Sequence, residues 1–390
     1  MKATKLMEQA ITSDFKLGII AGGQLGKMLT LAASNCDVRT HVMDPNPNCP
    51  SATTCSVFTV GDYTSFEDVY EFGKDLNLVT LEIENVNADA LIKLQEEGVK
   101  VFPDPHMLKV IQDKGLQKQF YARHNLPTSE FSLHADADAI RAAVKEGSVS
   151  VPFVQKTRTA GYDGRGVFVV KTEADLENLL EGPSLVEDKV AIEKEIAVIV
   201  CRNEDGEVRA FPVVEMEFNP TANLVEFLSC PANVNDQIAQ TATDLAINVI
   251  TAMDLKGILA VEMFLDQSGN VLINEVAPRP HNSGHHSIES VVTSQYQQHL
   301  RAVLNFPLGS TELKIPAIML NILGAPGHQG PVRYEGLKEC MAVEGMKLHI
   351  YGKRETRPFR KMGHATVIDQ SLESAREKAK FVQRTLRVVT

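Results

Sequence analysis

Apolar runs punctuated by turn signals extend along the whole chain, and their periods predict alternating strands and helices. Residues 15–21 form an apolar strand, residues 28–33 carry apolar side chains at helical spacing, and residues 39–43 form a second apolar strand. A strand, a helix and a strand in this order begin a doubly wound parallel sheet. Further strand and helix units fit residues 66–97, until Pro103 interrupts the pattern.

The pattern after residue 112 is different and predicts mixed α+β structure. An amphipathic helix is expected at 238–253, because apolar side chains recur there at helical spacing. A second helix is expected at 290–304, and residues 305–309 then break the chain. The strands expected in this part lie at 151–155, 167–170, 191–201, 210–217, 317–323, 348–351 and 364–368, with further helices at 113–125 and 372–386.

Two apolar runs near the middle of the chain each contain one acid. The runs at 258–265 and 271–275 flank a glycine-containing turn and predict a β-hairpin, with Glu262 on the first strand and Glu275 on the second. An isolated carboxylate inside an apolar strand is costly unless it is paired or bound to a metal. We therefore interpret the two acids as ligands of a cation, although two solvated acids on a half-exposed sheet would give the same pattern.

The register of this hairpin decides whether the two acids meet. If Leu265 lies opposite Leu272, Glu262 lies opposite Glu275 and both side chains share a face, whereas a slip of one residue separates them. The segment 274–285 follows directly and contains an amide, an arginine and histidines. This combination predicts a cation-bound triphosphate beside an anionic acceptor.

Composition and charge narrow the class of protein. The 390 residues suggest two or three domains, and contents of 44% apolar and 23% charged residues are typical of a globular protein. A net charge of −11 without a basic block argues against nucleic acid as a partner, and no apolar run is long enough to span a membrane. Residues 1–14 are polar and predict an extension rather than a secretory signal, and six scattered cysteines predict reduced thiols in a cytoplasmic protein.

A glycine-rich turn follows the first strand. The stretch 21–26 resembles a dinucleotide fingerprint, but Ala21 stands where its first glycine is required. Asp44, at the end of the second strand, lies where an acid would bind a ribose. A dinucleotide site, a site for another phosphate ligand and a purely structural turn are equally compatible with this pattern.

A second glycine-rich loop spans residues 156–166. Three glycines among two arginines and a lysine suit a flap over phosphates, and the loop lacks the ending of a Walker motif. A flexible hairpin tip with solvated charges is the alternative. Lys114 opens a predicted helix and Lys156 ends a predicted strand; each alone is more typical of a surface lysine.

Taken in order, these motifs resemble an ATP-grasp carboxylate–amine ligase, and most closely the N5-carboxyaminoimidazole ribonucleotide synthetase family. The resemblance covers residues 16–368, and its last two motifs distinguish this family from other ATP-grasp ligases. Phe359 stands where many relatives have glycine. The motifs are Gly23-Gln24-Leu25-Gly26, Gln117-Lys118-Gln119, Gly161-Tyr162-Asp163-Gly164-Arg165-Gly166, Ile273-Asn274-Glu275-Val276-Ala277-Pro278-Arg279, His281-Asn282-Ser283-Gly284-His285 and Arg357-Pro358-Phe359-Arg360-Lys361-Met362-Gly363-His364.

The resemblance implies an α/β and α+β fold with three domains. After the extension at 1–14, it places a Rossmann-like doubly wound parallel sheet at 15–112, an ATP-grasp domain at 113–305 and a small α+β cap at 306–390. It also implies a homodimer.

The resemblance further assigns roles to residues at matching positions. Phe218 lies where relatives often have an ATP-contacting histidine, and its ring could pack on the base. The ATP-binding set is Lys114, Lys156, Gly161, Tyr162, Asp163, Gly164, Arg165, Gly166, Val167, Glu187, Asp188, Lys189, Val190, Glu195, Phe218, Asn274 and Glu275. The ribonucleotide-binding set is Gly23, Gln24, Leu25, Tyr162, Asp163, Arg165, Lys353, Arg360 and Lys361. Glu262 and Glu275 would bind Mg²⁺, and the catalytic candidates are Arg279, His281 and Asn282.

The implied reaction joins bicarbonate to the amine of 5-aminoimidazole ribonucleotide and converts ATP to ADP and phosphate in purine biosynthesis. Three other classes compete with it. A dehydrogenase would use the turn at 21–26 for NAD. An inactive nucleotide-binding regulator would lack the magnesium acids, which are present here. Another ATP-grasp ligase would act on a different acid or amine.

Overall fold

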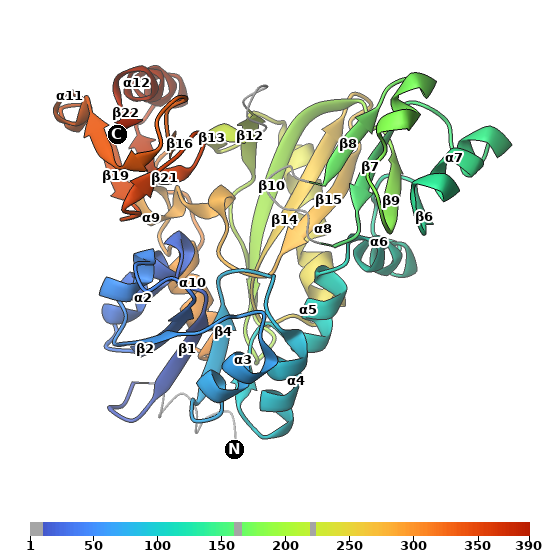
Figure 1. Ribbon diagram of the computed structural model, residues 1–390. Coiled ribbons are helices and arrows are strands. Elements are labelled where there is room, and N and C mark those ends of the chain that lie inside the picture. Colours follow the sequence, from blue (N-terminus) through green and yellow to red (C-terminus); the bar gives the residue numbers. More distant parts are fainter. Residues whose placement is uncertain (1–10, 160–165, 219–223) are drawn as a thin grey trace.

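The computed structural model describes residues 11–159, 166–218 and 224–390 (Figure 1). In these three stretches, no helix has both the length and the apolar character needed to cross a membrane. The N-terminal part, the central part and the C-terminal cap follow one another from blue to red, and the long central strands run beside both the N-terminal part and the cap (Figure 1).

The N-terminal part is built on a parallel sheet with strand order β3-β2-β1-β4-β5. The order reverses between β1 and β4, so their carboxyl ends form the edge where doubly wound sheets bind ligands. The prediction of a doubly wound sheet is confirmed. Its strands are β1 (Lys16–Ile20), β2 (Arg39–Asp44), β3 (Val57–Val60), β4 (Leu78–Leu81) and β5 (Lys100–Val101), with helices α2 (Gln24–Ser34), α3 (Phe66–Gly73), α4 (Ala88–Glu96) and α5 (Pro105–Ile111).

A four-stranded antiparallel sheet with order β6-β9-β7-β8 forms the outer lobe of the central part. Its elements are α6 (Lys114–Arg123), β6 (Phe131–His134), α7 (Ala137–Glu146), β7 (Phe153–Thr157), β8 (Val167–Val170) and β9 (Ser184–Asp188). Helix α7 was not predicted from the sequence, although Asp136 caps its start and Gly147, at φ +78°, ends it in the left-handed conformation.

A second sheet of nine strands runs through the central part and continues into the cap. Its order is β15-β14-β10-β12-β13-β16-β21-β19, with β11 paired to β10. One sheet therefore connects the hairpin acids to the cap. The strands are β10 (Ile192–Arg202), β11 (Val208–Ala210), β12 (Val214–Phe218), β13 (Val225–Cys230), β14 (Gly257–Asp266), β15 (Val271–Ala277), β16 (Ala317–Leu323), β19 (Met346–Ile350) and β21 (Lys361–Ile368).

Helices pack against this sheet. Helix α8 (Asp236–Ala252) packs Leu245, Val249 and Ile250 into the largest apolar cluster, and α12 (Leu372–Thr385) packs on the cap strands. The helix expected at 290–304 is shorter, because Ser294 forms a capping box with Gln297 and α10 begins only at Gln295. The remaining elements are α9 (Ser287–Ser290), α10 (Gln295–Val303), α11 (Leu337–Met341), β17 (Gly330–Pro331), β18 (Arg333–Glu335), β20 (Glu355–Thr356), β22 (Arg387–Val389) and the 3₁₀ helices at Pro50–Thr53, Glu173–Asn178 and Asn282–Gly284.

The hairpin of β14 and β15 brings its two acids together through a β-bulge. Leu265 lies opposite Val271, not Leu272, so the proposed starting register was wrong. A register shift between Ile273 and Glu275 then leaves one extra residue in β15 and places Glu262 opposite Glu275. Without that extra residue, Glu262 would face Asn274 instead. The predicted pairing of the two acids is therefore confirmed, but it results from the bulge and not from a regular alternation of residues along the strand.

Phe359 occupies the left-handed region of the backbone at φ +61° and is 41% exposed. A side chain in this region costs about 1 kcal/mol, and glycine pays no such cost. We expect Phe359→Gly to raise the free energy of unfolding by about 0.5–1 kcal/mol, measured by chemical denaturation. The matched control is Phe359→Ala, which also removes the ring but keeps Cβ. Equal stabilities of the glycine and alanine variants would contradict the prediction.

His299 is a fully buried histidine whose Nε2 lies 2.9 Å from the hydroxyl of Thr80 on β4. Burial lowers its pKa from 6.5 to about 3, so the folded protein holds the ring neutral while the unfolded chain protonates it below pH 6.5. The stability from this group is present above pH 6.5 and is lost as the pH falls. Between pH 7.5 and 5.5, the wild type should lose about 1.4 kcal/mol more than His299→Gln, measured by denaturant titration. Parallel pH profiles would contradict this.

Candidate active site

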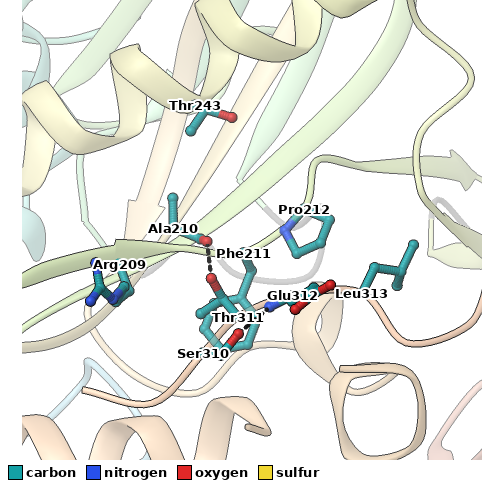
Figure 2. Close-up of a pocket in the computed structure, with 9 residues that line it drawn as sticks. All are labelled: Arg209, Ala210, Phe211, Pro212, Thr243, Ser310, Thr311, Glu312 and Leu313. Carbon is teal, nitrogen blue, oxygen red and sulfur yellow. Dashed lines mark hydrogen bonds between the residues drawn. The ribbon is translucent and has the colours of Figure 1, made fainter. Parts of the chain in front are cut away.

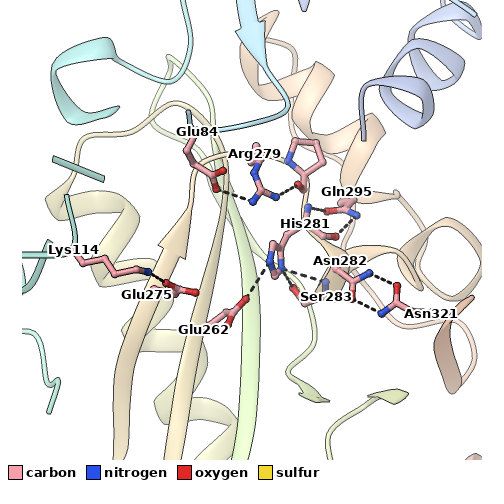
Figure 3. Close-up of polar contacts among 11 residues, drawn as sticks. Glu84, Lys114, Glu262, Glu275, Arg279, His281, Asn282, Ser283, Gln295 and Asn321 are labelled. Carbon is pink, nitrogen blue, oxygen red and sulfur yellow. Dashed lines mark hydrogen bonds and ion pairs between the residues drawn. The ribbon is translucent and has the colours of Figure 1, made fainter. Parts of the chain in front are cut away.

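The paired acids of the hairpin each contact a nitrogen-bearing side chain from another segment (Figure 3). Lys114 forms an ion pair with Glu275, and His281 Nε2 lies 3.1 Å from Glu262 Oε1. Partial burial acts to raise the pKa of Glu275, but Lys114 and Lys156 outweigh it and lower that pKa to about 2. Two acids, two lysines and a histidine thus meet on one face of the sheet.

Lys114 owes its position to the start of α6. Asp113 caps this helix by accepting the N–H groups of Gly115 and Leu116, and its carboxylate also binds Arg158 at 2.6 Å. The Lys114 N–H donates to the Arg158 carbonyl at 2.8 Å. Arg158 was expected to serve the glycine-rich flap, but its guanidinium instead connects the base of that loop to α6.

Lys156 lies at the centre of a buried polar network. Its Nζ donates to Asn274 Oδ1 at 2.9 Å and lies 2.6 Å from Glu187 Oε2, while Lys118 lies 2.5 Å from Glu187 Oε1. Burial acts to raise the pKa of Glu187, but the two lysines lower it to about 2; burial lowers the pKa of Lys118 to about 8. Asn274 is the extra residue of the bulge, so the bulge turns both Asn274 and Glu275 toward lysines.

Glu195 adds a further acid to the same region. It lies on β10 opposite Phe264, two residues from Ala197, which pairs with Glu262. Burial and, to a smaller extent, the charge of Glu262 raise the pKa of Glu195 to about 7, and Lys156 opposes the shift. Glu195 thus adds an oxygen donor beside Glu262 in the sheet, of the kind that a hard cation prefers.

The loop after β15 carries the catalytic candidates. Arg279 lies 2.8 Å from Glu84, and its Nε is buried without a hydrogen-bond partner. His281 Nδ1 lies 2.9 Å from the Ser283 hydroxyl, which orients the ring toward Glu262. Asn282 and Asn321 bind each other through reciprocal side-chain amide bonds of 2.9 and 3.2 Å (Figure 3). The structure thus brings Arg279 and His281 to the acids and connects Asn282 to the cap.

The first glycine-rich turn is filled by the chain itself. The N–H groups of Gly23 and Gly26 donate to the two oxygens of Glu82 at 2.5 and 2.6 Å. A carboxylate thereby occupies the start of α2, where a dinucleotide would place a phosphate. Burial raises the pKa of Glu82 to about 7, and the two N–H donors oppose the shift. Ala21 has φ +69°, the conformation for which the fingerprint requires glycine.

Glu82 and Glu84 were not predicted as site residues. A signal existed, because both follow β4 at the carboxyl edge of the sheet where the strand order reverses. Lys118 was quoted in a motif but received no role. Its burial cannot be read from periodicity, since its partners Thr128, Ser129 and Glu187 come from two other segments.

Of the predicted ribonucleotide ligands of the cap, Arg360 and Lys361 lie at the start of β21, and Lys353 lies before β20. Lys353 Nζ donates to the carbonyl of Lys361 at 2.8 Å, and Arg360 donates to the carbonyl of Glu355 at 2.7 Å. Gly23, Gln24 and Leu25, which were also predicted to bind the ribonucleotide, lie at the start of α2. The Gly23 N–H donates to Glu82, Gln24 is half-buried and Leu25 is buried. Lys27, on the same helix, donates to the carbonyl of Ile350 at 2.9 Å and connects α2 to the cap.

The remaining predicted ligands are not tested by contacts at the site. Gly161, Tyr162, Asp163, Gly164 and Arg165 lie outside the described residues. Gly166 has φ +74° and Val167 begins β8. Asp188 and Lys189 are exposed and Val190 is half-buried at the end of β9, and Phe218 ends β12. These assignments stay predictions.

A wider pocket in the described part of the chain lies elsewhere. It has a volume of about 620 Å³ and lies between β11 and the segment 310–313, where the Thr311 hydroxyl donates to the Ala210 carbonyl at 2.6 Å (Figure 2). None of the predicted site residues lines it. The pocket beside Lys114, Lys156 and Glu275 measures only about 10 Å³ because these side chains bind one another. Chemistry, not cavity size, therefore identifies the candidate site.

Comparison with known proteins decides the family. Residues 15–112 match the ribonucleotide synthetase preATP-grasp domain, residues 119–296 the ATP-grasp domain and residues 317–378 the phosphoribosylaminoimidazole carboxylase C-terminal domain. The crystal structure of N5-carboxyaminoimidazole ribonucleotide synthetase from Thermotoga maritima is 43% identical, with a TM-score of 0.89 over 96% of this chain and 99% of that one. The chain belongs to this family of ATP-grasp ligases.

Two further relatives extend the comparison. The synthase of Aspergillus clavatus, solved with ADP and 5-aminoimidazole ribonucleotide, is 31% identical with a TM-score of 0.87, covering 95% of this chain and 98% of that one. The chloroplastic phosphoribosylaminoimidazole carboxylase of Vigna aconitifolia is 40% identical over 92% of this chain. This chain spans 65% of the length of that plant protein. The predicted family and three-part fold are confirmed.

Proposed function

We propose that the protein carboxylates 5-aminoimidazole ribonucleotide with bicarbonate, in a reaction driven by conversion of ATP to ADP and phosphate. One observation carries the proposal. The pairing of Glu262 with Glu275 in the bulged hairpin brings Lys114, which would hold phosphates, next to His281, which would hold a small anion together with Arg279. A phosphoryl donor and a small acceptor acid would therefore meet in one place.

The chemistry requires such a junction. Bicarbonate is a poor electrophile because its leaving group would be hydroxide. Transfer of the γ-phosphoryl group to a bicarbonate oxygen gives carboxyphosphate, from which phosphate departs when the amine attacks carbon. Lys114 and Lys156 would stabilise the charge that develops on the transferred group, and Arg279 would orient the bicarbonate.

Mg²⁺ fits the donor set of this site. In the described part of the chain, no cluster of three or more His, Cys, Asp or Glu side chains could hold a metal by itself. Mg²⁺ is commonly held by one or two carboxylates together with substrate phosphates, and Glu262, Glu275 and Asn274 offer oxygen donors of this kind. The ion would supply positive charge to the triphosphate. A homodimer and a cytoplasmic location stay predictions of the resemblance.

The proposed function is tested by ADP release with each substrate omitted in turn. Full turnover should require ATP, bicarbonate and 5-aminoimidazole ribonucleotide together, and carboxylated ribonucleotide should form in step with ADP. Turnover that needs ATP and the ribonucleotide but is indifferent to bicarbonate would favour a ligase for a different acid. Reduction of NAD on addition of a hydroxy acid would favour a dehydrogenase, but Glu82 already fills the turn that class needs.

Arg360 tests the assignment of the ribonucleotide to the cap. Loss of one charge-assisted phosphate contact costs about 1.5–3 kcal/mol, so Arg360→Ala should raise the KM for the ribonucleotide roughly tenfold or more. ATP affinity, measured by titration, should change little. The control is Arg357→Ala, an exposed neighbour three residues away. A large loss of ATP affinity with an unchanged ribonucleotide KM would place Arg360 at the nucleotide instead.

A further inference from the structure

Two histidines in the motifs that distinguish this family have no role in the reaction described above, and the structure stacks them on each other. His285 follows the 3₁₀ helix of the catalytic loop, and His364 lies on β21 of the cap. Their ring centroids are 4.5 Å apart at an interplanar angle of 28°, and both side chains are buried. The stack therefore crosses from the catalytic loop to the cap.

Each ring is held from its own side. His285 Nδ1 faces two groups from α10, the Tyr296 hydroxyl at 3.0 Å and the Gln295 amide nitrogen at 3.3 Å. The amide nitrogen can only donate, so His285 Nδ1 accepts. His364 Nδ1 lies 3.1 Å from the Tyr351 hydroxyl, and its Nε2 is buried without a partner. Loss of one ring would leave the other without its stacking partner.

The catalytic end of this connection is fixed by Gln295. Its side chain accepts the N–H of His281 at 2.8 Å and donates to the carbonyl of His281 at 2.8 Å (Figure 3). The same amide nitrogen also lies 3.3 Å from His285 Nδ1. The main chain of His281 and the ring of His285 thus share one buried amide. A displacement of His285 would therefore move Gln295 and, through it, the main chain of His281, whose ring faces Glu262.

The cap end lies three residues from a predicted ribonucleotide ligand. His364 follows Lys361 on β21, and it also stacks on its cross-strand partner His349 at 4.4 Å. His349 Nε2 lies 2.8 Å from Glu289, which belongs to the same segment as His285. Together with Asn282 and Asn321, these pairs of side chains connect the catalytic loop to the cap.

We propose that His285 and His364 are positioning residues that couple the ribonucleotide bound by the cap to phosphoryl transfer at the His281 loop. The inference rests on the proposed function. When the stack is intact, the catalytic loop and the start of β21 move as one unit, so carboxyphosphate forms where the amine can reach it. When the stack is lost, ATP cleavage continues but carboxyphosphate is lost to water.

The test compares ADP released with ribonucleotide carboxylated. In His364→Ala this ratio should rise roughly fivefold over the wild type, and ATP affinity should be unchanged. His364→Phe keeps an aromatic ring for stacking and should return the ratio close to the wild-type value. The matched control, His328→Ala, removes a cap histidine that contacts Thr390 instead and should leave the ratio unchanged.

Other outcomes separate the inference from the function beneath it. If His364→Ala does not fold, His349→Ala removes a partly exposed ring from the same stack and should raise the ratio roughly twofold. An unchanged ratio in the soluble alanine variants, even with slower turnover, would overturn the coupling role and leave a structural one. A wild type that carboxylates no ribonucleotide would overturn the proposed function and this inference with it.

Discussion

Glu262→Gln and Glu275→Gln are each expected to lower ADP release by roughly a thousandfold while the protein stays folded. The two acids face each other across the hairpin, and Glu275 keeps a charged carboxylate because Lys114 and Lys156 lower its pKa. A glutamine keeps the shape but removes a negative oxygen ligand for Mg²⁺. Steady-state ADP release at saturating Mg²⁺ measures the loss, and circular dichroism checks the fold.

A control variant tests whether neutralising an acid elsewhere in the protein also lowers turnover. Glu312→Gln makes the same change at an exposed acid beside the distant cavity, and its turnover should match the wild type. Near-normal turnover of both hairpin variants at saturating Mg²⁺ would contradict the assignment of Glu262 and Glu275 as Mg²⁺ ligands. Recovery of only the Glu262 variant at high Mg²⁺ would leave Glu275 as the principal ligand.

Arg279→Lys should lower kcat roughly a hundredfold with little change in ATP affinity. The guanidinium binds Glu84 through one nitrogen and leaves a buried Nε without a partner, which fits a group that binds a second anion. Lysine can keep the ion pair with Glu84, but it lacks a planar set of donors that could hold bicarbonate at the same time. The readout is kcat from steady-state assays with bicarbonate varied.

The matched control for Arg279→Lys is Arg209→Lys, which changes a half-exposed arginine beside the distant cavity and should leave kcat unchanged. If Arg279→Lys keeps full kcat, Arg279 serves only to neutralise Glu84. If it loses kcat and ATP affinity equally, the arginine acts on the nucleotide.

The β14–β15 hairpin shows which structural features the sequence predicts and which it does not. Apolar runs predicted both strands and the meeting of Glu262 with Glu275, but the register proposed for Leu265 was wrong by one position. Hydrophobic alternation reports which residues face the core, and a bulge shifts that alternation by one residue. The run Val271-Leu272-Ile273 is apolar at every position, so its sequence does not show the shift. Asn274 could be recognised as the extra residue only from the pairing of the two strands.

Contacts between segments that are distant in the chain could not be predicted either, because the pattern of one segment does not identify its partners. Lys118 and Glu82 are buried charges whose partners come from other elements, so each reads as an ordinary surface residue in its own segment. The cap was expected to be separate from the central domain, yet β13 pairs with β16 and makes one sheet of both. The domain bounds therefore stay a prediction, although the order of the three parts does not.

The central claim is that bicarbonate receives the γ-phosphoryl group of ATP at the Glu262–Glu275 site. The most direct measurement uses bicarbonate labelled with oxygen-18 in a short incubation with ATP, Mg²⁺ and 5-aminoimidazole ribonucleotide. When carboxyphosphate breaks at carbon, the phosphate keeps one bicarbonate oxygen. Mass spectrometry should therefore find one labelled oxygen in each phosphate released by the wild type. Phosphate that carries no label, formed in step with ADP, would show that water or another acceptor takes the phosphoryl group and would contradict the account.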